Sequence, residues 1–286
     1  MAWSSLDLAG HCLSDRVRTD ALIAALGTVL RSGDLVLDAG AGSGVLSLAA
    51  TRMGASRVIA VEQNALLCKL LQQECKRQGV TVEVICGDLA HLRLFRVDVV
   101  IAELIDVWLL EEEFAKAVCQ LRSVGIIEER TKIIPSGYSF HIELGRCEWS
   151  AHRRELRFPY YEWTAYQDQS WDVPRFKCFV RWLNVGRVEA LEISRNGMRN
   201  LRFSLSVSTE QAVVLASMNA LRLSGTLHLC EGNAVEATGA MNSPLVLPLK
   251  EGAFSRAGGE IVISAIMSEG VASLDVAMNG TRILLW

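Results

Sequence analysis

Three glycines at alternate positions, Gly40, Gly42 and Gly44, stand just beyond an acidic residue, Asp38. The apolar run before the acid predicts a buried parallel strand, and the residues after the glycines predict a helix. Glycines in a strand-to-helix turn let a ligand approach the main chain, where N–H groups and a helix N-terminus point at it. The turn therefore predicts a cofactor site.

Two kinds of cofactor compete for this turn. A dinucleotide fingerprint needs its third glycine one residue later, where the chain has Val45. Asp38 would also lie where a pyrophosphate has to bind, whereas it would attract a cationic sulfonium with an amino-acid tail. We therefore favour S-adenosylmethionine as the cofactor.

The ends of the next two predicted strands fit the same cofactor. Glu62 follows a strand at 57–61, eighteen residues after the last glycine, where this architecture offers a carboxylate to two ribose hydroxyls. Asp88 follows a strand at 80–85 and can accept a hydrogen bond from the adenine amino group, while Leu89 offers a backbone N–H and an apolar wall. An ordinary surface glutamate and a turn aspartate are the plainer alternatives.

Glu103 follows directly from a fourth predicted strand, 97–102, whose Val and Ile residues predict a central place in the sheet. An acid at the end of a buried strand is costly to ionise unless a cation pairs with it. Glu112 comes nine residues later, in an acidic triplet that would also suit the first turn of a helix. We predict that Glu103 and Glu112 bind a flat cation between them, beside the reactive part of the cofactor.

Helices and strands alternate through the first half of the chain. Alternation of this kind predicts a doubly wound α/β sheet, here a Rossmann-like methyltransferase domain. In the third helix we expect four leucines, Leu66, Leu67, Leu70 and Leu71, on the buried side. Apolar spacing places the helices at 15–30, 47–53, 65–78 and 111–121.

The pattern changes to period two after Pro135. This predicts a C-terminal β-barrel or β-sandwich, with a hinge at 135–137 and domains at 1–135 and 136–286. Short alternating runs recur at 201–208, 221–229, 245–249, 261–266 and 271–278.

Composition excludes several classes of function. No uncharged stretch is long enough to span a membrane, and residues 1–7 lack the features of a secretory signal, so we expect a cytoplasmic chain. A net charge of −3 gives no basic surface for nucleic acid but would tolerate a cationic substrate. The eight cysteines lack metal-ligand spacing, so we expect reduced core thiols and no metal.

These residues together resemble the protein arginine N-methyltransferase family over nearly the whole chain. The resemblance implies that Arg18, in the segment 15–19, binds the carboxylate of S-adenosylmethionine, and that the loop from Glu103 to Glu112 binds a guanidino group. It also implies a homodimer formed through an arm, which we place in the aromatic-rich segment 148–182, where local packing of the aromatic residues is the alternative.

A guanidinium acceptor would explain a pair of glutamates. Its pKa lies above 12 and its nitrogen lone pairs are delocalised, so it is a poor nucleophile. Two carboxylates can concentrate electron density on the nitrogen that faces the methyl group, and alignment supplies much of the remaining rate. Because a sulfonium becomes neutral in the transfer, a strong general base is optional.

Three features depart from the family pattern. Asp106 stands where the family's loop has glycine, which would add a third carboxylate to the site. The stretch 239–246, which corresponds to the family's Thr-His-Trp element, has no histidine. The N-terminal lid helix is short, and Trp3 is either its remnant or ordinary packing.

Three functions stay open. The first is N-methylation of a guanidino group in a protein, a peptide or a small molecule such as free arginine. The second is methylation of another nucleophile, an amine or a heteroatom of a small metabolite, at the same cofactor site. The third, a cofactor-binding partner without turnover, is disfavoured because Glu103 and Glu112 are both present.

Overall fold

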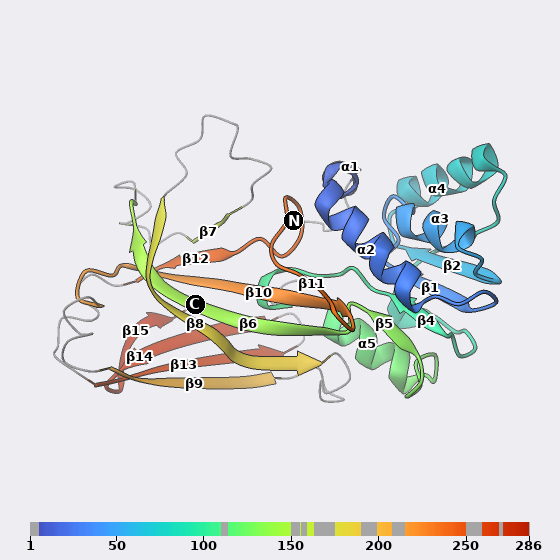
Figure 1. Ribbon diagram of the computed structural model, residues 1–286. Coiled ribbons are helices and arrows are strands. Elements are labelled where there is room, and N and C mark those ends of the chain that lie inside the picture. Colours follow the sequence, from blue (N-terminus) through green and yellow to red (C-terminus); the bar gives the residue numbers. More distant parts are fainter. Residues whose placement is uncertain are drawn as a thin grey trace.

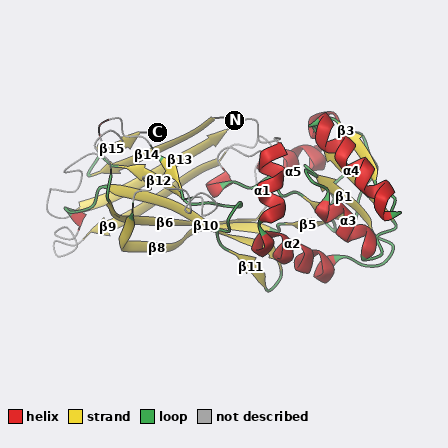
Figure 2. Ribbon diagram, turned by 90° about the horizontal axis from the view of Figure 1, so that it is seen from above, coloured by secondary structure: helices red, strands yellow, loops and turns green. Residues whose placement is uncertain are grey.

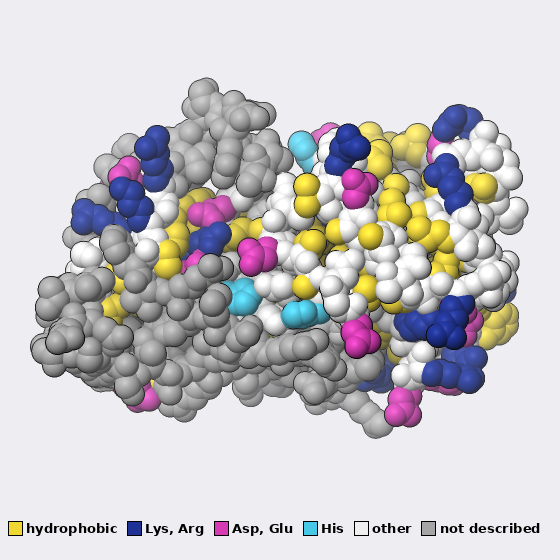
Figure 3. All heavy atoms as spheres, in the orientation of Figure 1, with side chains coloured by type: hydrophobic (Ala, Val, Ile, Leu, Met, Phe, Trp, Pro, Cys, Tyr) yellow, Lys and Arg dark blue, Asp and Glu magenta, His cyan; other side chains and the backbone are white. Residues whose placement is uncertain are grey.

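A computed structural model of the chain has two parts that lie side by side, one helical with a parallel sheet and one made of antiparallel strands (Figures 1 and 2). In the described residues no helix is long and apolar enough to cross a membrane. On the face in Figure 3, basic and acidic side chains are interspersed among the described residues. The structure describes residues 6–109, 114–149, 155, 159–162, 175–189, 199–207, 215–249, 259–268 and 271–285.

The first part contains a five-stranded sheet in the order β3-β2-β1-β4-β5, and every pairing is parallel. The strand order reverses at β1, so the edge beyond the carboxyl ends of β1 and β4 is where ligands bind in such sheets. The α/β prediction for this part is therefore confirmed. The strands are β1 Leu35–Ala39, β2 Arg57–Glu62, β3 Glu83–Cys86, β4 Val99–Ile101 and β5 Lys132–Ile134.

Helices cover the sheet on both sides, with α3 and α4 above it and α5 below it in the view of Figure 1. Asp15 caps α2 and Asn64 caps α4, whereas Gly79 ends α4 in a left-handed conformation. The helices are α1 Leu6–Ser14, α2 Arg16–Val29, α3 Val45–Arg52, α4 Ala65–Gln78 and α5 Phe114–Ser123, with single 3-10 turns η1 Leu89–His91 and η2 Val107–Leu109.

The buried side of α4 differs from the predicted one. Leu67 and Leu71 are buried, but Leu66 and Leu70 are 50% and 43% exposed. The helix packs on β2 and β3 along a stripe at i and i+4 that continues through Cys75, so only half of the leucines face the sheet. The expectation of core thiols was also wrong in part, since Cys86 and Cys178 are exposed.

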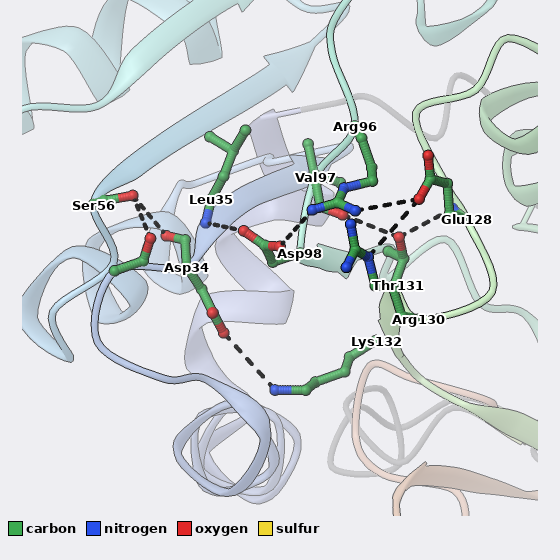
Figure 4. A network of polar contacts seen from close by, with 11 residues as sticks. Asp34, Leu35, Ser56, Arg96, Val97, Asp98, Glu128, Arg130, Thr131 and Lys132 are labelled. Atoms are coloured by element: carbon green, nitrogen blue, oxygen red, sulfur yellow. Dashed lines mark hydrogen bonds and ion pairs between the residues drawn. The ribbon is translucent and has the colours of Figure 1, made fainter.

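A polar network closes the edge of the parallel sheet where the strands begin (Figure 4). Asp98 accepts a hydrogen bond from the Leu35 N–H at 2.9 Å, and the Thr131 hydroxyl donates to the Val97 carbonyl at 3.0 Å. Arg96 lies 3.3 Å from a Glu128 oxygen. These groups satisfy one another at the end of the sheet opposite the glycine turn, so they serve the fold and leave the other edge for chemistry.

The second part consists of two antiparallel sheets, with the orders β7-β12-β10-β6-β8 and β15-β14-β13-β9, and β11 pairs with β10. Antiparallel strands were predicted, but among the described residues neither sheet closes into a barrel, and β6 and β8 were not predicted. The strands are β6 Gly137–Cys147, β7 Tyr160–Tyr161, β8 Phe176–Glu189, β9 Arg199–Val207, β10 Ala220–Cys230, β11 Asn233–Val235, β12 Leu245–Pro248, β13 Gly259–Ser268, β14 Val271–Met278 and β15 Thr281–Leu285.

One apolar core joins the two parts. Leu22 and Leu26 of α2 belong to the same buried cluster as Phe140 of β6 and Leu223 of β10. Only two residues separate the end of β5 from the start of β6, and the Ser136 N–H donates to the His228 carbonyl at 2.7 Å. The division into domains at 135/136 stays a prediction, but β10 clearly packs against the start of the chain.

Candidate active site

The carboxyl edge of the parallel sheet brings most of the predicted site residues together. Asp88 follows β3, Glu62 ends β2, Asp38 lies in β1 and Glu103 follows β4. Because these four strands are neighbours in that order, the four acids stand along one edge of the sheet. This arrangement follows from parallel pairing, which brings the carboxyl ends of all strands to the same side.

The glycine turn is tied to the end of β2. The N–H groups of Gly40 and Ala41 both donate to the Val61 carbonyl at 2.9 Å. At Gly44, with φ of 76°, a Cβ would meet a Leu71 methyl at 2.1 Å, so this glycine serves packing. At Gly42, with φ of 53°, the nearest atom to a Cβ would be the Gly40 carbonyl oxygen at 4.0 Å. The main chain at Gly42 is therefore open to a ligand.

Glu62 is held by the main chain around it. One carboxylate oxygen accepts from the Gly42 N–H at 2.9 Å and the other from the Asn64 N–H at 2.8 Å. The side chain is 5% exposed. A carboxylate can accept several hydrogen bonds, which is the capacity that a ribose hydroxyl would require.

Asp38 is buried beneath the turn, with 2% of its surface exposed. Its Oδ2 accepts a hydrogen bond from the Ser47 hydroxyl at 2.6 Å. Burial raises the pKa of Asp38 to about 6, against the opposing effects of the Ser47 hydrogen bonds and the Arg18 charge. The carboxylate is therefore mostly ionised at neutral pH, and a bound cation would keep it ionised at lower pH.

Arg18 and Glu103 form a buried ion pair between Nη2 and Oε2, with side chains 7% and 13% exposed. Burial by itself lowers the pKa of Arg18, but the charge and hydrogen bond of Glu103 outweigh it and the net shift is upward. The Arg18 Nε is buried without a hydrogen-bond partner. The sequence predicted these two residues for different ligands, and the structure brings them into contact.

Asp88 and Leu89 lie at the far end of the edge. Asp88 is exposed, and its Oδ1 accepts from the Ala90 N–H at 2.8 Å, which caps η1. Leu89 is half-buried against the core. The turn role considered for Asp88 is thus present, and contact of either residue with adenine stays a prediction.

Several predicted features lie outside the described residues. Glu112 and Trp3 are among them, as is most of the proposed arm between 148 and 182. Asp106, the third carboxylate near the site, is described and is 6% exposed. The pairing of Glu103 with Glu112 therefore stays a prediction.

A contact that the sequence did not predict joins the antiparallel part to this edge. Asp15 accepts hydrogen bonds from the Thr238 hydroxyl at 2.5 Å and from the Ala240 N–H at 2.7 Å. Thr238 and Ala240 belong to the loop between β11 and β12, which includes the stretch without the expected histidine. No local pattern could have indicated a contact between residues 223 positions apart.

The chemistry of these groups fits an adenosyl sulfonium amino acid. Arg18 has a buried donor for a carboxylate, Asp38 is an anion for an amino group or a sulfonium, and Glu62 is an acceptor for a ribose. The open main chain at Gly42 gives such a ligand room to approach.

Comparison with known proteins agrees with this fold. The family model of ribosomal protein L11 methyltransferase (PrmA) matches residues 17–151, just under half of the chain. Two solved structures superpose over nearly the whole chain at low identity, which supports the fold alone. A Trypanosoma brucei PRMT1 enzyme–prozyme heterotetrameric complex with AdoHcy has a TM-score of 0.66 at 18% identity and covers 100% of this chain and 98% of its own. Arabidopsis thaliana protein arginine methyltransferase 10 has a TM-score of 0.64 at 17% identity and covers 99% and 97%.

The chain is similar to methyltransferases both in sequence and in fold. Two curated relatives are named for different substrates. Ribosomal protein L11 methyltransferase from Pelotomaculum thermopropionicum is 36% identical over 141 residues, 47% of this chain and 43% of the relative. Arginine N(omega)-methyltransferase from Streptomyces achromogenes is 32% identical over 136 residues, 45% of this chain and 37% of the relative.

The chain thus spans about two fifths of the length of those curated relatives. The matched family region, 17–151, contains every site residue predicted from the sequence. The loop that contacts Asp15 lies beyond that region.

Proposed function

We propose that this chain transfers a methyl group from S-adenosylmethionine to a guanidino nitrogen of arginine, in a protein or peptide, or of a small guanidino compound. One observation carries the proposal: Glu103, at the carboxyl edge of the sheet and 13% exposed, holds a guanidinium group, that of Arg18. A carboxylate that binds one guanidinium in a largely buried place has the charge and access to bind another.

Bound at this edge, S-adenosylmethionine would supply an electrophilic methyl group on a sulfonium. In our proposal Arg18 binds the amino-acid carboxylate, Asp38 stabilises the positive end, and Glu62 accepts from the ribose hydroxyls. Asp88 and Leu89 would contact the adenine. The support is the fit of each group's charge and hydrogen-bonding capacity to that part of the cofactor.

On the acceptor side, we propose that Glu103 and Glu112 orient the guanidino group. Their charges would offset the delocalised positive charge and concentrate electron density on the nitrogen in line with the methyl group. No strong base is required, because the proton can leave after the transfer.

The Arg18–Glu103 pair would also couple the two ligands. When the carboxylate of the bound cofactor draws Arg18 toward it, Glu103 keeps an uncompensated negative charge in a largely buried place. Such a charge favours a second guanidinium. Because coupling is reciprocal, each ligand should raise the affinity for the other by the same factor.

The names of the similar proteins support arginine as the substrate and an oligomer as the assembly. One is an arginine N(omega)-methyltransferase, and probable protein arginine N-methyltransferase 3 of Arabidopsis thaliana is 41% identical over 81 residues. The PRMT1 structure is a heterotetrameric complex. We extend the proposal to a homodimer in the cytoplasm, and a fully active monomer on a sizing column would contradict the dimer.

A second candidate is methylation of another nucleophile, an amine or a heteroatom. The match to the L11 methyltransferase family model favours it, since that family is named for a different substrate. Incubation with labelled S-adenosylmethionine and a panel of guanidino and amine compounds, peptides included, separates the two. Labelled product from guanidino compounds supports the first candidate, whereas product from amines alone would exclude it.

A further inference from the structure

Both carboxylate oxygens of Asp15 accept hydrogen bonds from the chain itself. Oδ1 accepts from the Arg18 N–H at 3.1 Å, which caps the start of α2. Oδ2 accepts from the Thr238 hydroxyl at 2.5 Å and from the Ala240 N–H at 2.7 Å. The two sets of donors come from different parts of the molecule, so Asp15 links the antiparallel part to the helix that carries Arg18.

The loop on the other side of this link is firmly held. The Thr238 N–H donates to the Met241 carbonyl at 2.9 Å, and the Met241 N–H donates to the Thr238 hydroxyl at 3.2 Å. Asn242, at a φ of 56°, donates to the Gly225 carbonyl and accepts from the Tyr138 hydroxyl, both at 2.7 Å. The loop is therefore held by β6 and β10 independently of its contact with Asp15.

On the α2 side of this link, the position of the Arg18 guanidinium depends on where α2 begins. Its side chain reaches Glu103, and Nη1 donates to the Cys12 carbonyl at 3.5 Å. A long arginine side chain loses most of its rotamer freedom when it is held in one conformation. A small displacement of the first turn of α2 would move the guanidinium away from the carboxylates that face it.

We infer that Asp15 is a positioning residue, through which Thr238 and Ala240 hold Arg18 at the cofactor end of the site; this rests on the proposed function. In this inference Asp15 acts through Arg18, because one of its oxygens accepts from the Arg18 N–H and the other from Thr238 and Ala240. The antiparallel part therefore influences cofactor affinity through one hydroxyl and one N–H.

Two variants separate this link from helix capping. Asp15→Asn keeps an oxygen for the Arg18 N–H, and asparagine caps helices as well as aspartate does, but its amide nitrogen would face two donors. Thr238→Val removes only the hydroxyl, and Thr238→Ser keeps it. Thr28→Val is the matched control, because Thr28 lies on the exposed side of the same helix and donates only to the Ala24 carbonyl.

Each protein is titrated calorimetrically with S-adenosylhomocysteine, and hydrogen exchange is followed at the amides of Arg18 and Thr19. Asp15→Asn and Thr238→Val should weaken binding about five- to tenfold, as expected for the loss of hydrogen bonds to a charged group. Exchange at both amides should rise in the same two variants. Thr238→Ser and Thr28→Val should stay within about twofold of the wild-type affinity.

The outcomes separate the link from the proposed function. Wild-type affinity and unchanged exchange in Thr238→Val would overturn the inference, as would equal weakening in Thr28→Val. If the wild-type protein binds no adenosyl ligand, the proposed function fails, and exchange at Arg18 and Thr19 still decides whether Thr238 holds the start of α2.

Discussion

The carboxylates of the candidate site stand where parallel strands end, whereas Glu143 stands in the middle of an antiparallel strand. Glu62 and Glu103 are of the first kind, and their partners are main-chain N–H groups and an arginine from another element. Glu143 of β6 is of the second kind, and it pairs with Arg222, which lies opposite it on β10.

The same contrast holds for the neutral polar groups of β6. His141 Nε2 lies 2.7 Å from the Thr226 hydroxyl, and the Ser139 hydroxyl lies 2.7 Å from His228 Nε2. These cross-strand partners are fixed by register, so the polar groups satisfy one another within the sheet. Polar groups at strand ends are oriented by loops and can exchange partners with a ligand. Substitutions in the two regions should therefore have different consequences.

The largest difference is expected between the site glutamates and Glu143. Glu103→Gln and Glu112→Gln should each lower kcat by about a hundredfold or more, because each removes a charge from the acceptor in the transition state. Glu143→Gln should lower the melting temperature and leave kcat near the wild-type value. Steady-state kinetics and thermal unfolding measure both. Activity that survives the double variant Glu103→Gln/Glu112→Gln would refute the proposed role of the pair.

Arg18 should give the next largest effect. Arg18→Met removes a charged donor from the cofactor carboxylate, so we expect about ten- to a hundredfold weaker binding of S-adenosylhomocysteine. It also leaves Glu103 unpaired in a largely buried place and should destabilise the fold. The double variant Arg18→Met/Glu103→Gln should regain stability but not affinity. Recovery of affinity in the double variant would show that Arg18 acts only by neutralising Glu103.

A glycine pair tests whether the turn is open for a ligand. Gly42→Ala and Gly79→Ala both place a side chain at positive φ, at 53° and 65°, without an immediate steric clash. Each should cost about 1 kcal/mol of folding free energy. Only Gly42→Ala should also weaken adenosyl binding, by about tenfold, because its methyl group would project into the ligand's approach. Equal affinities in the two variants would place the cofactor away from the turn.

Local sequence patterns predicted the positions of site residues that are determined by strand order and by where strands end. An apolar run followed by an acid or by glycines was enough to bring Asp38, Gly42, Glu62 and Glu103 to one edge, because a parallel sheet does so by construction. Contacts between distant segments were not predictable in this way. The Arg18–Glu103 pair and the Asp15–Thr238 bond both depend on how separate elements pack.

Burial along α4 and the closure of the β part depend on tertiary packing too. Leu66 and Leu70 are as apolar as their neighbours, and only the angle at which α4 meets the sheet decides that they face outward. Period-two runs indicated strands, and β14 matches the predicted 271–278, but alternation does not state which strands pair.

Asp38 should give the smallest effect, visible only below neutral pH. Its pKa of about 6 lies above the ordinary 3.8, so the folded protein binds more protons than the unfolded chain between these values. The stability from this group is therefore complete below about pH 4 and is lost as the pH rises through 6. A cationic ligand needs the ionised form, so binding of S-adenosylmethionine should be about fourfold weaker at pH 5.5 than at pH 7.5. Calorimetry across this range measures the change.

Two variants test the assignment to Asp38. Ser47→Ala should move the midpoint of the titration to higher pH, because the Ser47 hydrogen bonds lower the pKa of Asp38. Asp38→Asn should bind the cofactor more weakly and show no midpoint near 6. A midpoint near 6 that persists in Asp38→Asn would assign the titration to another group.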